Sequence, residues 1–125
     1  MLTRLENELE MIISETVLTL GISPNTRGYQ CIKLSISACL KTPELSDNFS
    51  ARLYPYIAGQ MGMTVGAVER AIRHAISSGW YRHDEELSAE IFRKLLQSRI
   101  DIPMNTLFIT AVTEWIRLHY PELVD

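Results

Sequence analysis

The chain has 125 residues, of which 46% are hydrophobic and 22% are charged, and its formal net charge is −3. These values are typical of one globular domain with a real core, and no apolar run approaches the roughly 18 residues that a membrane span needs. The first ten residues carry three glutamates and one arginine, unlike a signal or transit peptide, so we expect a cytoplasmic protein with no membrane partner.

Two helices are predicted in the first third of the chain. Thr3-Arg4-Leu5-Glu6 has the form of a capping box, and Gly21 is a suitable stop for the helix that follows it. A second helix is expected from about Thr26 to Lys41, before Thr42-Pro43 breaks it. Its predicted buried stripe is Tyr29, Ile32, Ile36, Cys39 and Leu40.

The two cysteines, Cys31 and Cys39, both fall on the second predicted helix. Eight residues of helix place them about 12 Å apart along the axis, which is too far for a disulfide between them. We expect two buried free thiols in a reducing compartment.

The middle of the chain has a pattern of two helices joined by a tight turn. Residues 44–53 suggest one or two helical turns, and residues 54–61 suggest a helix with Pro55 in its first turn. Gly62-Met63-Thr64 then forms a turn, with Thr64 as the N-cap of a helix over residues 65–78. This arrangement predicts a helix-turn-helix at about residues 54–79, whose second helix lies in the DNA major groove.

The second of these helices separates apolar residues from charges. Val68, Ile72, Ala75 and Ile76 recur with helical spacing and form the predicted inward stripe. The opposite side carries Gly66, Glu69, Arg70, Arg73 and Ser77, with His74 at the margin. A solvated face with an ion pair between Glu69 and Arg73 is the alternative interpretation, and a partly buried structural role is the alternative for His74.

The remaining third of the chain predicts two more helices. The acidic run Asp84-Glu85-Glu86 suits a helix N-terminus, and the helix is expected to continue to about Arg99. After a loop with Pro103, Asn105 is the expected cap of a last helix. No long period-two alternation occurs, so the prediction is an all-α, compact bundle of five or six helices forming one domain over residues 1–125.

Several short motifs resemble one family. The nonapeptide Val68-Glu69-Arg70-Ala71-Ile72-Arg73-His74-Ala75-Ile76 resembles the recognition helix of the sporulation master response regulator of endospore-forming bacteria, in its C-terminal DNA-binding (effector) domain. Other matching segments are Gly21, Arg27-Gly28-Tyr29, Leu53-Tyr54-Pro55-x-Ile57-Ala58, Trp80, Pro103-x-Asn105-x-x-Phe108-Ile109-x-x-Val112 and Arg117-Leu118. The resemblance covers nearly the whole chain.

The resemblance implies a six-helix domain that binds a short DNA box as a transcription factor. It implies base contacts for Glu69 and Arg70, and it places Arg73 and His74 in the same run. It also implies a contact with the RNA polymerase sigma factor after the recognition helix, although residues 83–96 diverge here. The chain has Gly66-Ala67 where the family usually has Ser-Arg, and we expect it to lack the family's phosphorylated receiver domain. Because it opens with Met1 and a capped helix, we expect a stand-alone protein.

The residue types suit double-stranded DNA as the partner. Arg70 can donate two hydrogen bonds to guanine and Glu69 can accept one from cytosine, while Arg73 and His74 reach base edges or phosphates. The phosphate contacts are predicted from Thr64, Arg27 and Lys33.

A second hypothesis keeps the fold but not the DNA affinity. The acidic ends and Gly66-Ala67 favour a protein-interaction module that antagonises a related regulator. For a DNA reader we expect a homodimer, formed through the first helix or on DNA. No nucleophile, metal-ligand or phosphate-loop pattern occurs, so we expect no enzyme activity, no metal, no cofactor and no small-molecule substrate.

Overall fold

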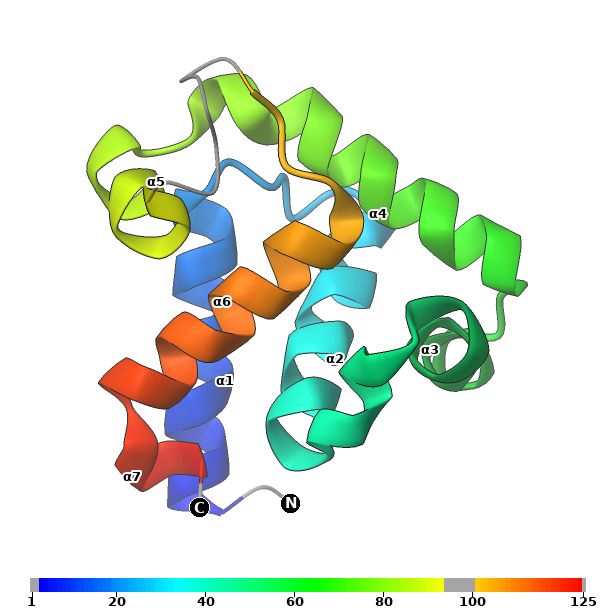
Figure 1. Cartoon of the computed structure of the whole chain (residues 1–125), viewed down its shortest axis with the longest axis horizontal. Helices are drawn as coiled ribbons and strands as arrows, with labels where there is room; N and C mark the ends of the chain where they lie inside the picture. Colours follow the sequence, from blue (N-terminus) through cyan, green and yellow to red (C-terminus); the bar gives the residue numbers. More distant parts are fainter. Residues whose placement is uncertain (1–2, 94–100, 125) are drawn as a thin grey trace.

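The computed structural model describes residues 3–93 and 101–124. The regular secondary structure within these ranges is helical (Figure 1), which confirms the all-α prediction. The α-helices are α1 (Arg4–Thr19), α2 (Arg27–Lys41), α3 (Tyr54–Met61), α4 (Val65–Gly79), α5 (Glu85–Phe92), α6 (Asn105–His119) and α7 (Pro121–Val124). The four-residue α7 adds a short seventh helix, and it begins at proline, which is favoured in the first helical position.

Three tight helical segments connect these elements. The 3₁₀ segments are η1 (Pro43–Asp47) and η3 (Trp80–Arg82), and η2 (Phe49–Leu53) is a π-helical turn. The predicted one or two helical turns over residues 44–53 are therefore present, as η1 and η2. They place Phe49 and Leu53 in the core just before α3 begins.

The ends of α1 follow the predicted capping chemistry. The Thr3 hydroxyl accepts a hydrogen bond from the Glu6 N–H at 3.1 Å, and the Thr3 N–H donates to the Glu6 carboxylate at 3.4 Å. Gly21 has φ +98°, a left-handed conformation that costs glycine little. The capping box and the glycine stop are both confirmed.

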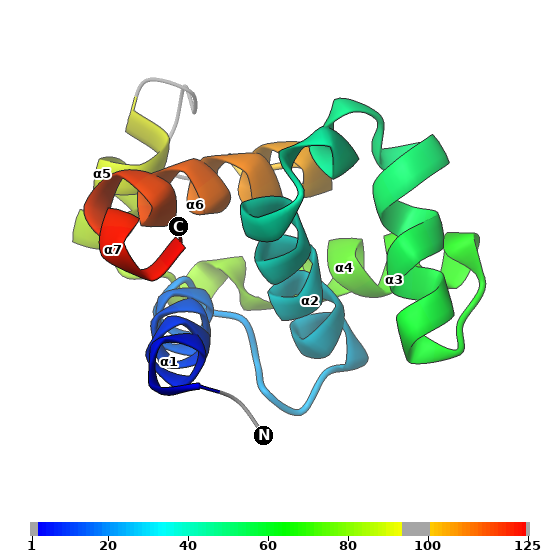
Figure 2. The same cartoon turned by 90° about the horizontal axis from the view of Figure 1, so that it is seen from below.

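The second helix, α2, is the central element of the core. It stands between α1 on one side and α3 on the other, with α4 passing behind it (Figure 2), and it also packs against α6. The predicted stripe of Tyr29, Ile32, Ile36, Cys39 and Leu40 is buried throughout. Apolar side chains from α1 to α6 join it in a continuous hydrophobic core.

Both cysteines are buried free thiols, as predicted. Burial raises the pKa of the Cys31 thiol, and it raises the pKa of Cys39 to about 11. Each thiol therefore stays protonated and serves as a small apolar core group.

The predicted extent of the helix after Asp84 is wrong at its C-terminal end. The expected helix continued to about Arg99, but α5 ends at Phe92, and Arg93 has φ +44°, which is incompatible with a right-handed helix. Residues 94–100 lie outside the described ranges.

Candidate nucleic-acid interface

The third and fourth helices form a helix-turn-helix. Three residues, Gly62–Thr64, separate α3 from α4, and Gly62 has φ +65°, the left-handed conformation of a helix C-cap. In Figure 1, α3 is seen nearly end-on whereas α4 runs across the view, so the two helices cross. The fold therefore contains the predicted motif, with α4 as its second helix.

Thr64 caps α4 as predicted. Its Oγ1 accepts a hydrogen bond from the Ala67 N–H at 3.1 Å. Because the hydroxyl acts as an acceptor in the cap, its own proton can be donated outward. The N-terminal turn of α4 thus combines a hydroxyl donor with the positive end of the helix dipole.

The two faces of α4 are divided as the sequence predicts. Val68, Ile72, Ala75 and Ile76 are at most 1% exposed. The exposed positions on the opposite side include Gly66, Arg70, Arg73, His74 and Ser77. A partly buried structural role for His74 is therefore wrong, because the helix turns this side chain to the surface.

Glu69 and Arg73 form an ion pair along the exposed side of α4. Their side chains are 36% and 59% exposed, respectively. The alternative interpretation of this face correctly anticipated the pair. Exposed pairs of this spacing contribute only about 0.3–0.5 kcal/mol, so separating the two side chains costs little.

The Arg70 side chain folds back over Gly66, one helical turn earlier. A Cβ placed on Gly66 would lie 3.1 Å from Arg70 Nη1. The missing side chain at position 66 therefore leaves space that the Arg70 guanidinium uses. This links one departure from the family pattern to the position of the neighbouring arginine.

The two predicted cationic phosphate contacts lie in different surroundings. Arg27 is exposed at the start of α2, beside Gly28, whose Cβ would meet Ala71 O of α4 at 2.2 Å. By contrast, Lys33 Nζ lies 2.7 Å from Glu10 Oε1, and the Lys33 side chain is only 14% exposed. The structure thus brings the start of α2 against α4, whereas Lys33 is held against α1.

Asn105 and Tyr54 are residues that sequence reasoning did not place in the site. The prediction that Asn105 caps the last helix is wrong, because Met104 is the N-cap and Asn105 lies inside α6. The residue is 8% exposed, and its Nδ2 donates to the Glu69 main-chain oxygen at 3.0 Å and to Tyr54 Oη at 3.2 Å. Burial raises the pKa of the Tyr54 hydroxyl, which therefore stays neutral.

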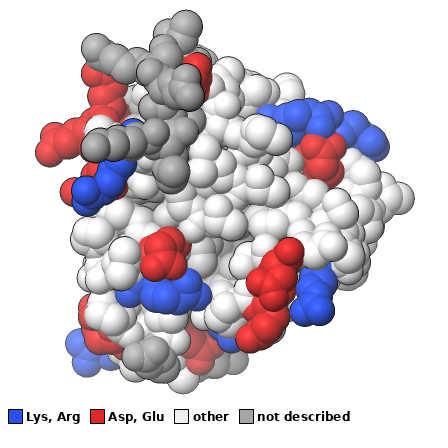
Figure 3. All heavy atoms as spheres, viewed as in Figure 1, with Lys and Arg blue, Asp and Glu red and all other residues white. Residues whose placement is uncertain are grey.

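The space-filling view shows how charge is distributed on one face (Figure 3). Basic groups flank an acidic one over α4, and much of the remaining surface in this view is uncharged. The described residues hold no group of three or more His, Cys, Asp and Glu arranged to bind a metal ion. No helix within the described ranges is long and apolar enough to cross a membrane.

The family model described as Sporulation initiation factor Spo0A C terminal matches residues 13–116. The chain belongs to this family. The members of the Spo0A C-terminal family are DNA-binding effector domains, and the family is not an enzyme family. The chain is therefore a DNA-binding regulator in the broad sense. The match spans both helices of the helix-turn-helix and most of α6, so it includes Tyr54, Glu69 and Asn105.

Proposed function

We propose that this chain is a sequence-specific transcriptional regulator that inserts α4 into the DNA major groove. The observation that carries the proposal is the exposed charged face of α4, opposite a face that is at most 1% exposed. A helix held in this way presents Glu69, Arg70 and Arg73 on a rigid support, and its diameter matches the major groove.

The base contacts follow from hydrogen-bond chemistry. Arg70 donates two hydrogen bonds to O6 and N7 of a guanine, and Glu69 accepts one from the N4 amine of a cytosine. Arg73 and His74 extend the contact to the next base edges or phosphates. Each good bidentate contact is worth about 1–3 kcal/mol, which exceeds the cost of opening the Glu69–Arg73 pair.

The phosphate contacts come from the elements beside α4. Thr64 donates its hydroxyl proton from the N-cap, and Arg27 reaches a phosphate from the start of α2. Lys33 would first have to leave Glu10, so we place it outside the main contact set.

Removing the Arg70 side chain tests the base-reading role. The probe is the duplex that the wild-type chain selects from a randomised pool, compared with a scrambled duplex of equal length. We expect Arg70→Ala to weaken binding to the selected duplex by about tenfold or more and to flatten base preference at one position. Arg4→Ala is the control, because it removes an equal charge from α1, where Arg4 pairs with Glu8. Unchanged affinity and preference in Arg70→Ala would refute the role.

Salt dependence separates the phosphate contacts from the base contacts. Each neutralised phosphate contributes about −0.9 to the slope of log affinity against log salt. Arg27→Ala should therefore reduce the slope by about one and leave base preference unchanged. A slope identical to that of the wild type would exclude Arg27 from the interface.

A second candidate function is a protein-interaction module that pairs with a related regulator and antagonises it. The Glu69–Arg73 ion pair favours it, because the paired face offers less net positive charge to DNA. This candidate predicts a stable hetero-complex in light scattering and no DNA binding even at low salt. Dimerisation through α1 and a sigma-factor contact through residues 83–96 remain predictions.

A further inference from the structure

Asn105 connects three elements through one side-chain amide. It is the first residue of α6, and its Nδ2 reaches Tyr54 Oη at the start of α3 and the Glu69 main-chain oxygen in α4. Asn105 is a buried residue, only 8% exposed. Both helices of the helix-turn-helix are therefore tied to α6 at the same point.

The bond to Glu69 acts on the backbone and not on a side chain. A main-chain carbonyl has two lone pairs, so it can accept from Asn105 while it takes part in the helix. The turn of α4 that is held in this way carries Glu69 and Arg70. The amide therefore constrains the backbone position from which these two side chains extend, and this constraint does not depend on the identity of either side chain.

An open pocket lies beside the hydrogen bonds of Asn105. A cavity of about 480 Å³ opens at the junction, lined by Tyr54, Glu69, Arg73, Ser77 and residues 102–106. On this flank the described side chains leave open space beside the amide, whereas the opposite face of α4 is packed in the core. Asn105 therefore supplies side-chain hydrogen bonds that join α6 to α3 and α4 on this flank.

We propose that Asn105, supported by Tyr54, is a positioning residue that sets how α4 presents Glu69 and Arg70 to the bases. The inference rests on the proposed function and names a residue that controls its specificity. Hydrogen bonds to base edges weaken steeply with misalignment, whereas attraction to phosphates does not. Loss of the tie therefore lowers sequence preference more than overall DNA affinity.

The binding test uses the full chain with Asn105→Ala, and the selected and scrambled duplexes described above. We expect about a tenfold loss on the selected duplex and less than about a twofold change on the scrambled one. Tyr54→Phe removes a single acceptor, so it should give a smaller loss of the same kind and remains informative if Asn105→Ala folds poorly. An equal loss on both duplexes, or no loss on either, would overturn the proposal.

A structural measurement keeps the inference separate from the function. Residual dipolar couplings of the α4 amides, referred to those of α2, report the orientation of α4 without DNA. We expect the orientation of α4 to change in Asn105→Ala and to stay the same in Thr16→Ala. Thr16 is the control because it is about as buried as Asn105 but its hydroxyl bonds within α1. An unchanged α4 refutes positioning by Asn105. A wild-type chain that prefers no duplex refutes the proposed function alone, because the couplings still decide the positioning role.

Discussion

Gly21 and Gly79 touch through their main chains. A Cβ on Gly79 would lie 2.2 Å from Gly21 O, and a Cβ on Gly21 would lie 2.2 Å from Gly79 O. The Arg82 guanidinium also donates to Gly21 O at 2.8 Å, and the Asp84 N–H donates to Thr19 O at 3.0 Å. The C-terminal end of α4 is therefore fixed against the end of α1 by backbone atoms.

This contact predicts opposite effects for the same substitution at two helical glycines. Gly79→Ala forces the two backbones apart and should lower the free energy of unfolding by about 2 kcal/mol. Gly59→Ala in α3 meets no atom within 4 Å and should raise it by about 0.5–1 kcal/mol through helix propensity. Urea denaturation measures both. Stabilisation by both substitutions would contradict the close contact.

Gly66→Ala tests the space beneath Arg70. The Cβ would meet only the end of a flexible side chain at 3.1 Å, so the guanidinium can move away at little cost. We expect the free energy of unfolding to rise by about 0.5 kcal/mol, because alanine favours the helix. Thermal unfolding followed by circular dichroism measures the change, and a clear destabilisation would show that Arg70 cannot move.

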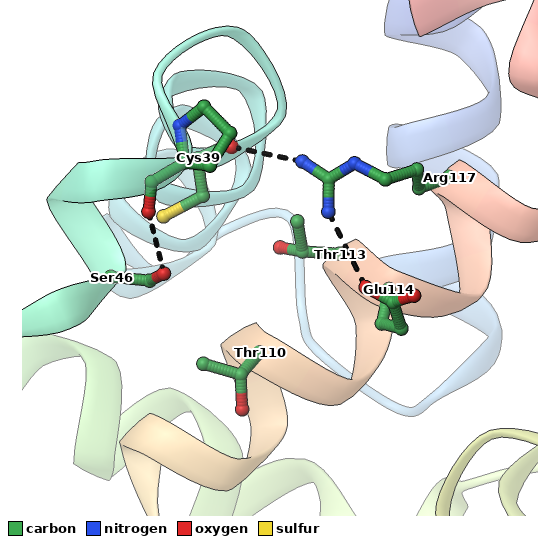
Figure 4. Close-up of a pocket in the computed structure, with 7 residues that line it drawn as sticks. Cys39, Ser46, Thr110, Thr113, Glu114 and Arg117 are labelled. Carbon is green, nitrogen blue, oxygen red and sulfur yellow. Dashed lines mark hydrogen bonds and ion pairs between the residues drawn. The ribbon is translucent and has the colours of Figure 1, made fainter.

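Thr113→Val should stabilise the fold. Thr113 is 5% exposed and faces a cavity of about 120 Å³ shared with Cys39, Ser46 and Arg117 (Figure 4), and its hydroxyl has no hydrogen-bond partner among the described residues. Replacing an unsatisfied hydroxyl by a methyl group of similar shape should gain about 1 kcal/mol in the free energy of unfolding.

Thr16→Val is the matched control for that substitution. Thr16 is 6% exposed, but its hydroxyl donates to Ile12 O at 2.7 Å, so the same change should cost about 0.5–1 kcal/mol. Equal losses in the two variants would show that the Thr113 hydroxyl finds a partner in solution, such as a water in the cavity.

The raised pKa of the Cys39 thiol predicts that the free energy of unfolding falls at alkaline pH. Its pKa is about 11 in the folded chain against 9.0 in an unfolded one. The folded state therefore keeps a proton that the unfolded state releases, and the free energy of unfolding falls between about pH 9 and pH 11. The expected loss is at most about 3 kcal/mol, since one pKa unit corresponds to about 1.4 kcal/mol. Urea titrations across this range should show a shallower fall for Cys39→Ala; identical slopes would contradict the assignment.

Local sequence patterns predicted the helices well because periodicity and caps act over a few residues. The stripe of α2, the inward face of α4 and the caps at Thr3 and Thr64 are all set by neighbours within one or two turns. The same reasoning found the helix-turn-helix, since a three-residue turn between two amphipathic segments leaves few alternatives.

The contacts between elements were not predictable in this way. Asn105 was assigned to a cap because its sequence neighbours suggest one, yet its partners lie 36 and 51 residues away, at Glu69 and Tyr54. The phosphate contact of Lys33 stays a prediction, and nothing in its own helix reveals that α1 brings Glu10 beside it. Pairings of this kind depend on how the helices pack, which periodicity does not specify.

The hydrogen bond from Asn105 to the Glu69 main-chain oxygen does not depend on which side chain occupies position 69. Every amino acid supplies the same carbonyl at position 69, so the side chain there can be exchanged without loosening α4. The residues that hold α4 in the core, Val68 and Ile72 among them, are likewise separate from those on its exposed face. Under the proposed function, substitutions at a few surface positions of α4 would change the DNA sequence that is bound and leave the scaffold intact.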